Sequence, residues 1–77
     1  MPPLPVCSGR EAVRALEAAG WHVTRQRGSH LVLATAGKSA RLSVPLHAEL
    51  RPGTLRSLIR DAGLSVAEFI DLLGRRK

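Results

Sequence analysis

The chain has 77 residues, which is enough for one small domain and too few for two independent hydrophobic cores. This length excludes the doubly wound dinucleotide-binding folds and the barrel enzymes. Twelve Lys and Arg residues against six Asp and Glu residues give a formal net charge of +6, and 44% of the residues are hydrophobic, as in a folded chain. A small basic domain suits a polyanion, such as RNA, DNA, an acidic protein or an anionic membrane.

The few aromatic residues and the single cysteine exclude some kinds of partner and site. Trp21 and Phe69 are the only aromatic residues, so we exclude a module that binds single strands by stacking several bases on aromatic rings. The single cysteine, Cys7, excludes an intrachain disulfide and a cysteine-based zinc site, and it favours a reduced, cytoplasmic setting. We expect no signal peptide and no membrane span, because no stretch approaches the roughly 18 apolar residues that a span needs.

The first predicted element is a helix. Residues 1–7 are rich in proline, and we expect them to be flexible. Ser8 and Glu11 have the spacing of a capping box, which predicts a helix over about 9–19. Gly20 is placed to end this helix in the left-handed conformation. The predicted buried stripe is Ala12, Val13, Leu16 and Ala19.

Three segments with a period of two follow, and they predict an antiparallel sheet. We expect strands over about 21–26, 30–34 and 40–44, joined by turns that contain glycine. Pro45 is expected to end the third strand, because proline cannot donate to a central ladder. The side chains expected to face inward are Trp21, Val23, Leu31, Leu33, Leu42 and Val44. Those expected on the opposite face are His22, Thr24, His30, Val32, Arg41 and Ser43.

Two helices are predicted in the last part of the chain. Pro52 is favourable in a first helical turn, and Gly63 is placed to end that helix. Its predicted buried stripe is Leu55, Leu58, Ile59 and Ala62. Ser65 and Glu68 form a second capping box, which predicts a short C-terminal helix that ends at Gly74. The buried stripe of this last helix is predicted at Val66, Phe69, Ile70 and Leu73.

This order of elements predicts an α+β fold, with a three-stranded antiparallel sheet and the helices on one face of it. It resembles the α-β-β-β-α architecture of double-stranded-RNA-binding domains, with a short helix added at the C-terminus. We expect a flexible N-terminus over 1–7, a single domain over 8–73 and a basic tail over 74–77. The open face of the sheet is polar and is where we expect a partner to bind.

A mechanism centred on one histidine fits these residues. The six acidic residues are dispersed, and the spacing of the three histidines does not suggest a zinc site. RNA carries its own nucleophile, the 2′-hydroxyl, so one imidazole can take its proton or protonate the leaving 5′-oxygen while arginines hold the phosphate. His30 follows a Gly-Ser turn and opens the middle strand. The pattern alone leaves open that His30 is an ordinary surface histidine.

Three sequence blocks resemble the HicA toxin family. Gly28-Ser29-His30 before a strand is similar to the G-S-H motif of that family. The second block, Val44–Arg56, resembles its V-P-x-H…E-[LI]-x-x-G-T-L-R pattern, and the third, Asp61–Ser65, resembles its A-G-[LI]-S pattern. The resemblance extends over about residues 8–73.

The resemblance implies a small mRNA interferase, an endoribonuclease that needs no metal or other cofactor. It implies a type II toxin neutralised by a HicB-type antitoxin, with which it can form a higher-order complex, and it places the catalytic histidine at His30. Many members carry a second histidine directly afterwards, where this chain has Leu31. We expect Leu31 to point into the core, so that catalysis survives this difference. His47 matches a recurrent histidine of the family, which either contacts substrate or orders its loop by a hydrogen bond.

The remaining basic residues are candidates for phosphate binding, and we expect Arg41 beside His30 on the open face. The full set of predicted substrate-binding residues is Arg25, Arg27, Gly28, Ser29, Lys38, Arg41 and His47. Arg56 and Arg60 either contact phosphate or form a solvated helix face. Two alternative functions stay open: a non-catalytic RNA-binding module, and a domain whose open face binds an acidic protein.

Overall fold

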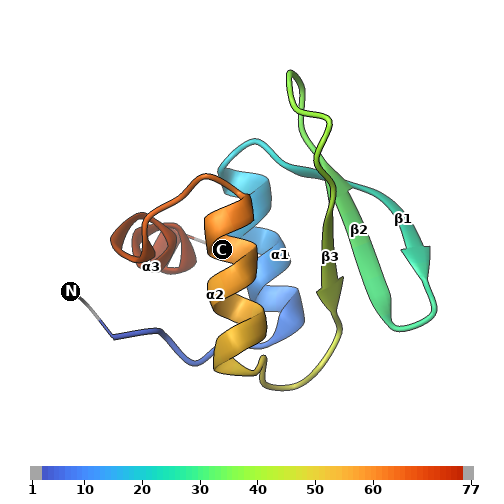
Figure 1. Cartoon of the computed structure of the whole chain (residues 1–77). Helices are drawn as coiled ribbons and strands as arrows, with labels where there is room; N and C mark the ends of the chain where they lie inside the picture. The colour runs from blue at the N-terminus through green and yellow to red at the C-terminus, as the bar shows by residue number, and fades with distance from the viewer. Residues whose placement is uncertain (1–2, 76–77) are drawn as a thin grey trace.

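The computed structural model describes residues 3–75 of the chain. The elements follow in the order α1 (Gly9–Ala18), β1 (His22–Arg27), β2 (His30–Ala34), β3 (Leu42–Pro45), α2 (Pro52–Asp61) and α3 (Val66–Arg75). The strands form one antiparallel sheet in the order β1-β2-β3. Figure 1 shows α1 and α2 between the sheet and α3, so that the helices lie on one face of the sheet. The predicted α+β fold is therefore confirmed. The C-terminal helix is ten residues long, as are the other two helices.

Both predicted capping boxes are confirmed. In the first, the amide of Glu11 donates to Ser8 Oγ at 3.1 Å, and the amide of Ser8 donates to a carboxylate oxygen of Glu11 at 2.9 Å. Ser65 and Glu68 make the same two hydrogen bonds at the start of α3. These reciprocal bonds satisfy amide groups that the first helical turn leaves without a partner. The predicted end of α3 at Gly74 is wrong, because the helix continues to Arg75. A glycine within a helix costs only about 1 kcal/mol and does not require the chain to turn.

The core lies between the sheet and α3, and most of its predicted members are buried. The stripe of α2 is confirmed at all four positions. Ala19 lies just after the end of α1 and is exposed. Ala15 is buried instead, because α1 is covered by the sheet on one side and by α3 on the other. In α3, Ile70 is 37% exposed, whereas Leu72 and Leu73 pack against the core.

The segment before α1 packs against the domain. Cys7 is 4% exposed within the core, and Leu4 is half-buried against it. The amide of Leu50 donates to the carbonyl of Cys7 at 2.9 Å. Apolar contacts and a backbone hydrogen bond therefore hold Leu4 and Cys7 against the domain, within the segment that was expected to be flexible. Met1 and Pro2 lie outside the described residues.

Strand β1 contains a β-bulge, and this bulge decides which side chains reach the open face. Val23 pairs with Leu33, but Arg25 pairs with Val32, so Thr24 is an extra residue without a partner in the ladder. Regular alternation from Trp21 would turn Arg25 and Arg27 toward the helices. The bulge returns both arginines to the open face. The hydroxyl of Thr24 donates to the carbonyl of Val32 at 3.1 Å.

Candidate active site on the open sheet face

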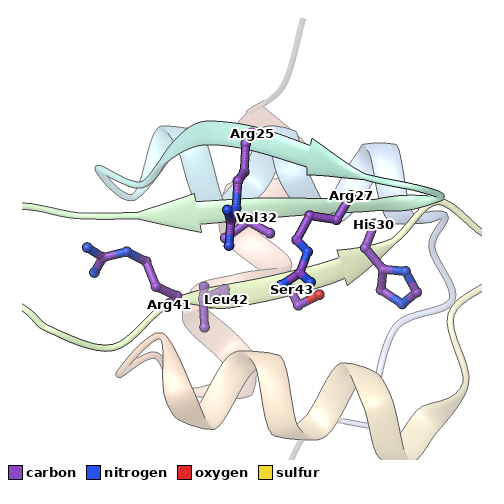
Figure 2. Close-up of a pocket in the computed structure, with 7 residues that line it drawn as sticks. All are labelled: Arg25, Arg27, His30, Val32, Arg41, Leu42 and Ser43. Carbon is purple, nitrogen blue, oxygen red and sulfur yellow. The ribbon is translucent and has the colours of Figure 1, made fainter.

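The open face of the sheet carries a pocket of about 590 Å³. Residues of all three strands, together with the residue that precedes β3, line this pocket. They are Arg25, Arg27, His30, Val32, Arg41, Leu42 and Ser43 (Figure 2). The lining contains three guanidinium groups, one imidazole and no carboxylate. This composition favours an anionic ligand.

The strand register sets which groups lie near His30. His30 is the first residue of β2, and it lies opposite Arg27 on β1 and Pro45 on β3. Side chains of directly opposed residues project to the same face of a sheet. Figure 2 shows the Arg27 side chain extending across the sheet toward Ser43, and the Arg25 side chain extending toward Val32. The two guanidinium groups therefore lie over β2 and β3, on the same face as the imidazole.

Arg41 lies at the other end of the pocket. Figure 2 shows its side chain directed away from His30, and its Nη1 donates to the carbonyl of Ser39 at 3.0 Å. The prediction that Arg41 lies beside His30 is therefore wrong, although Arg41 does line the same pocket. The reason is the register: Pro45 is the residue opposite His30, and four strand residues span about 13 Å.

The turn before His30 is held by its backbone. Gly28 has a φ of +59°, which favours glycine, and its carbonyl accepts from Gln26 Nε2 at 2.9 Å. The carbonyl of Ser29 accepts from the amide of Leu46 at 2.7 Å. This bond ties the turn to the segment that follows β3. Gly28 and Ser29 thus position the start of β2, and neither lines the pocket.

Three other candidates lie outside the pocket. The Nζ of Lys38 is 6.0 Å from the centroid of the Trp21 ring, and it lies where a Cβ on Gly63 would contact it, so it is on the helix side of the sheet. His47 is exposed, and its carbonyl accepts from the amide of Gly9 at 2.9 Å. His22 is opposite Ala34, at the far end of β2 from His30.

Leu31 faces the helices, as predicted. It is half-buried and packs against the core, so the residue that follows His30 lies on the opposite side of the sheet from the pocket. Val32, Leu42 and Ser43 line the pocket without having been predicted as site residues. The alternation placed Val32 and Ser43 on the correct face, but their residue types gave no chemical signal.

We also looked for a metal site and for a membrane-spanning helix. Across residues 3–75, no group of three or more His, Cys, Asp or Glu side chains is arranged to hold a metal ion. The same part of the chain contains no helix that is long and apolar enough to cross a membrane. The side chains of the pocket can bind a phosphate through arginine and transfer a proton through histidine.

Comparisons with known proteins agree with this geometry. The model of a protein family described as "HicA toxin of bacterial toxin-antitoxin" matches residues 9–64. A solved structure titled "Toxin-Antitoxin complex from Streptococcus pneumoniae" contains a chain with 36% sequence identity and a TM-score of 0.66. That similarity covers 74% of this chain and 97% of the other. No curated protein matches the chain.

Proposed function

The chain belongs to the HicA toxin family, and we propose that it is an endoribonuclease toxin that cleaves mRNA through His30 without a metal ion. The observation that carries this proposal is the pairing of His30 with Arg27 on the open face of the sheet. A proton-transfer group and a phosphate-binding group are then side by side on a surface that an RNA strand can reach. Family membership supports the toxin function itself.

The proposed reaction uses the nucleophile of the RNA. The 2′-oxygen attacks the adjacent phosphorus atom as it loses its proton, and the bond from phosphorus to the 5′-oxygen breaks. His30 carries one proton in this step: it accepts the proton of the 2′-hydroxyl while water protonates the leaving 5′-oxygen, or it donates a proton to the 5′-oxygen while water accepts that of the 2′-hydroxyl. The products are a 2′,3′-cyclic phosphate and a 5′-hydroxyl. DNA has no 2′-hydroxyl, so the same site leaves it intact.

Arginine residues bind the phosphate groups of the RNA in this proposal. Arg27 and Arg25 bind the non-bridging oxygens and stabilise the additional negative charge of the transition state, because guanidinium groups donate paired hydrogen bonds to phosphate. Arg41 binds a neighbouring phosphate of the strand, since it lines the pocket away from His30. Gly28 and Ser29 hold the turn, and Lys38 and His47 have no direct role.

The same exposed face is the proposed target of an antitoxin. His30, Arg25 and Arg27 are all exposed, so a protein with an acidic surface can cover them together. We propose that a HicB-type antitoxin blocks access to the pocket in this way. The similar structure titled as a toxin–antitoxin complex supports such a partner. Because the substrate is mRNA, the proposed site of action is the cytoplasm.

The proposal is tested by incubating the purified chain with RNA in excess EDTA. Wild-type protein should produce fragments that end in a 2′,3′-cyclic phosphate, and His30→Ala should leave the RNA intact while its circular dichroism spectrum is unchanged. His22→Ala is the matched control, because His22 is also exposed in the sheet but lies outside the pocket. It should cleave like the wild-type chain.

Three outcomes contradict the proposal. Full cleavage by His30→Ala would show that the reaction does not need His30. Cleavage that EDTA abolishes would indicate a metal-dependent nuclease. Intact RNA after long incubation with wild-type protein, together with binding that weakens steeply with salt, would favour the non-catalytic RNA-binding module.

A further inference from the structure

A second groove joins the active-site pocket along β3. It has a volume of about 420 Å³ and lies between β3 and α2, which Figure 1 shows alongside each other. Its lining is Arg41, Leu42, Ser43, Thr54, Ser57, Leu58 and Asp61. The first three of these residues also line the active-site pocket, so the two hollows are continuous across β3. The cleavage chemistry proposed above does not use the residues from α2.

The part of α2 that lines the groove presents three polar side chains beside one buried leucine. Thr54, Ser57, Leu58 and Asp61 have the spacing i, i+3, i+4 and i+7, which places them on one side of a helix. The neighbouring face of α2, which includes Leu55 and Ile59, is apolar and buried in the core. Packing on the sheet therefore accounts for the apolar face and leaves the polar one available for a ligand.

We propose that this groove binds the nucleobase next to the scissile phosphate and thereby gives the toxin a sequence preference. This inference rests on the proposed ribonuclease function. The two hollows differ in charge: the active-site pocket has three arginines and no acid, whereas the groove has one arginine, one carboxylate and three hydroxyl groups. A carboxylate repels phosphate but accepts hydrogen bonds from the amino and imino groups of a base.

The floor of the groove also suits a base. Leu42 and Leu58 are buried and provide an apolar floor, while Thr54 and Ser57 are half-buried at its edge. An apolar floor with polar groups around it suits a planar ligand that also offers hydrogen-bonding groups, and the volume of the groove lies in the usual range for a small-molecule site. The lack of aromatic residues is no obstacle, because a base can stack on the guanidinium plane of Arg41.

Asp61 is accessible for this contact. Its carboxylate is 3.4 Å from Nε of Arg60, and the two side chains are 52% and 73% exposed. An ion pair that is this exposed is weak, so a ligand can displace it. Ser43, at the junction of the two hollows, is two residues from Pro45, which lies opposite His30. That separation is about 7 Å along the strand, which is short enough for one nucleotide to reach from the scissile phosphate to the groove.

The test measures how much one base contributes to binding. The probes are RNA hexanucleotides with 2′-O-methyl groups, which cannot be cleaved, and matched hexanucleotides that lack the base at one position. With the wild-type chain, removing the base at one position should weaken binding about tenfold, and at the other positions by much less. With Asp61→Asn, the loss at that position should fall to about twofold. Ser57→Ala should reduce it in the same direction.

Glu17→Gln is the matched control. It removes the same charge from an exposed position of α1, away from both hollows, so it should keep the tenfold loss. Equal losses in the wild-type chain and in Asp61→Asn would overturn the inference, and so would the absence of any sensitive position. If both groove variants instead weaken binding of the antitoxin with no change in base dependence, the groove is a protein contact and the inference is wrong. Cleavage in EDTA that depends on His30 would leave the ribonuclease proposal standing in each of these cases.

Discussion

Arg27 and His30 lie directly opposite each other in the β1–β2 ladder, on either side of a two-residue turn. Opposed residues in an antiparallel pair have Cβ atoms about 5 Å apart on one face of the sheet. The hairpin therefore places the base of the Arg27 side chain beside His30, so that its guanidinium group can reach a phosphate that contacts the imidazole. Arg25 and Arg41 lie farther from His30 in the strand register, so their side chains must extend farther to make the same contact.

This difference predicts unequal effects of two arginine substitutions. Arg27→Ala should lower the rate of RNA cleavage about 100-fold or more, because it removes a charged donor at the position where negative charge develops. Arg41→Ala should lower the rate less than tenfold and act mainly through weaker RNA binding. Single-turnover cleavage at saturating and subsaturating protein concentrations separates the two effects. If the two variants lost the same factor in the rate at saturating protein, the distance of each arginine from His30 along the strands would not determine its contribution to cleavage.

The bulge at Thr24 makes two single-residue deletions informative. Without Thr24, the pairs that flank the bulge, Val23–Leu33 and Arg25–Val32, become consecutive pairs of a regular ladder. Arg25 then stays on the open face. Without Gln26, Arg25 moves into its place opposite Leu31, and Thr24 takes the place opposite Val32. That ladder is regular too, but Arg25 then faces the helix side.

Both deletion variants should fold, and they should differ in RNA binding. We expect deletion of Gln26 to weaken binding about tenfold relative to deletion of Thr24, since it takes one phosphate-binding arginine off the open face. The slope of log affinity against log salt concentration should also fall by about one for the Gln26 deletion. Thermal unfolding of both variants is the control. Equal affinities and slopes in two folded variants would contradict the role given to Arg25.

Local sequence signals predicted most of the fold. The capping boxes at Ser8 and Ser65 and the left-handed glycines at Gly20 and Gly63 act within a few residues of themselves, so they can be read without the rest of the chain. The bulge at Thr24 could not be predicted, because residues 24–27 are all polar and no apolar side chain marks the change of phase that the extra residue causes.

The candidate site was predicted in part. The Gly-Ser-His run is contiguous, and together with the two later blocks that resemble the family it makes His30 the candidate histidine. The distance of Arg41 from His30 depends on how the loop between β2 and β3 sets the register, and the groove beside α2 depends on tertiary packing. Neither leaves a pattern in the sequence. The position of Cys7 in the core also depends on a tertiary contact, the hydrogen bond from the amide of Leu50.

The packed segment before α1 predicts a stability difference between two neighbouring substitutions. Leu4 is half-buried against the core, whereas Val6 is 77% exposed. Leu4→Ala should lower the free energy of unfolding by about 1 kcal/mol, because it removes apolar contacts. Val6→Ala should change it by less than about 0.5 kcal/mol. Urea denaturation followed by tryptophan fluorescence measures both. Equal midpoints for the two variants would show that the segment does not contribute to the core.

Gly9 couples the start of α1 to the active-site turn. A Cβ at this position would overlap the carbonyl oxygen of Pro45 and lie 3.1 Å from the Cα of Leu46. The amide of Leu46 in turn donates to the carbonyl of Ser29, directly before His30. Backbone atoms cannot rotate away as a side chain can, so the segment that follows β3 must move if Gly9 is replaced.

Gly9→Ala should therefore lower the free energy of unfolding by about 2 kcal/mol, a cost typical of overpacking. It should also reduce RNA cleavage, because the displaced segment no longer holds the turn that carries His30. Gly53→Ala is the matched control: a Cβ there meets no atom within 4 Å, so the better helix former should raise stability by up to about 1 kcal/mol. Urea denaturation and the EDTA cleavage assay measure the two effects. A Gly9→Ala chain as stable and as active as the Gly53→Ala chain would show that the contact with Pro45 does not position the turn.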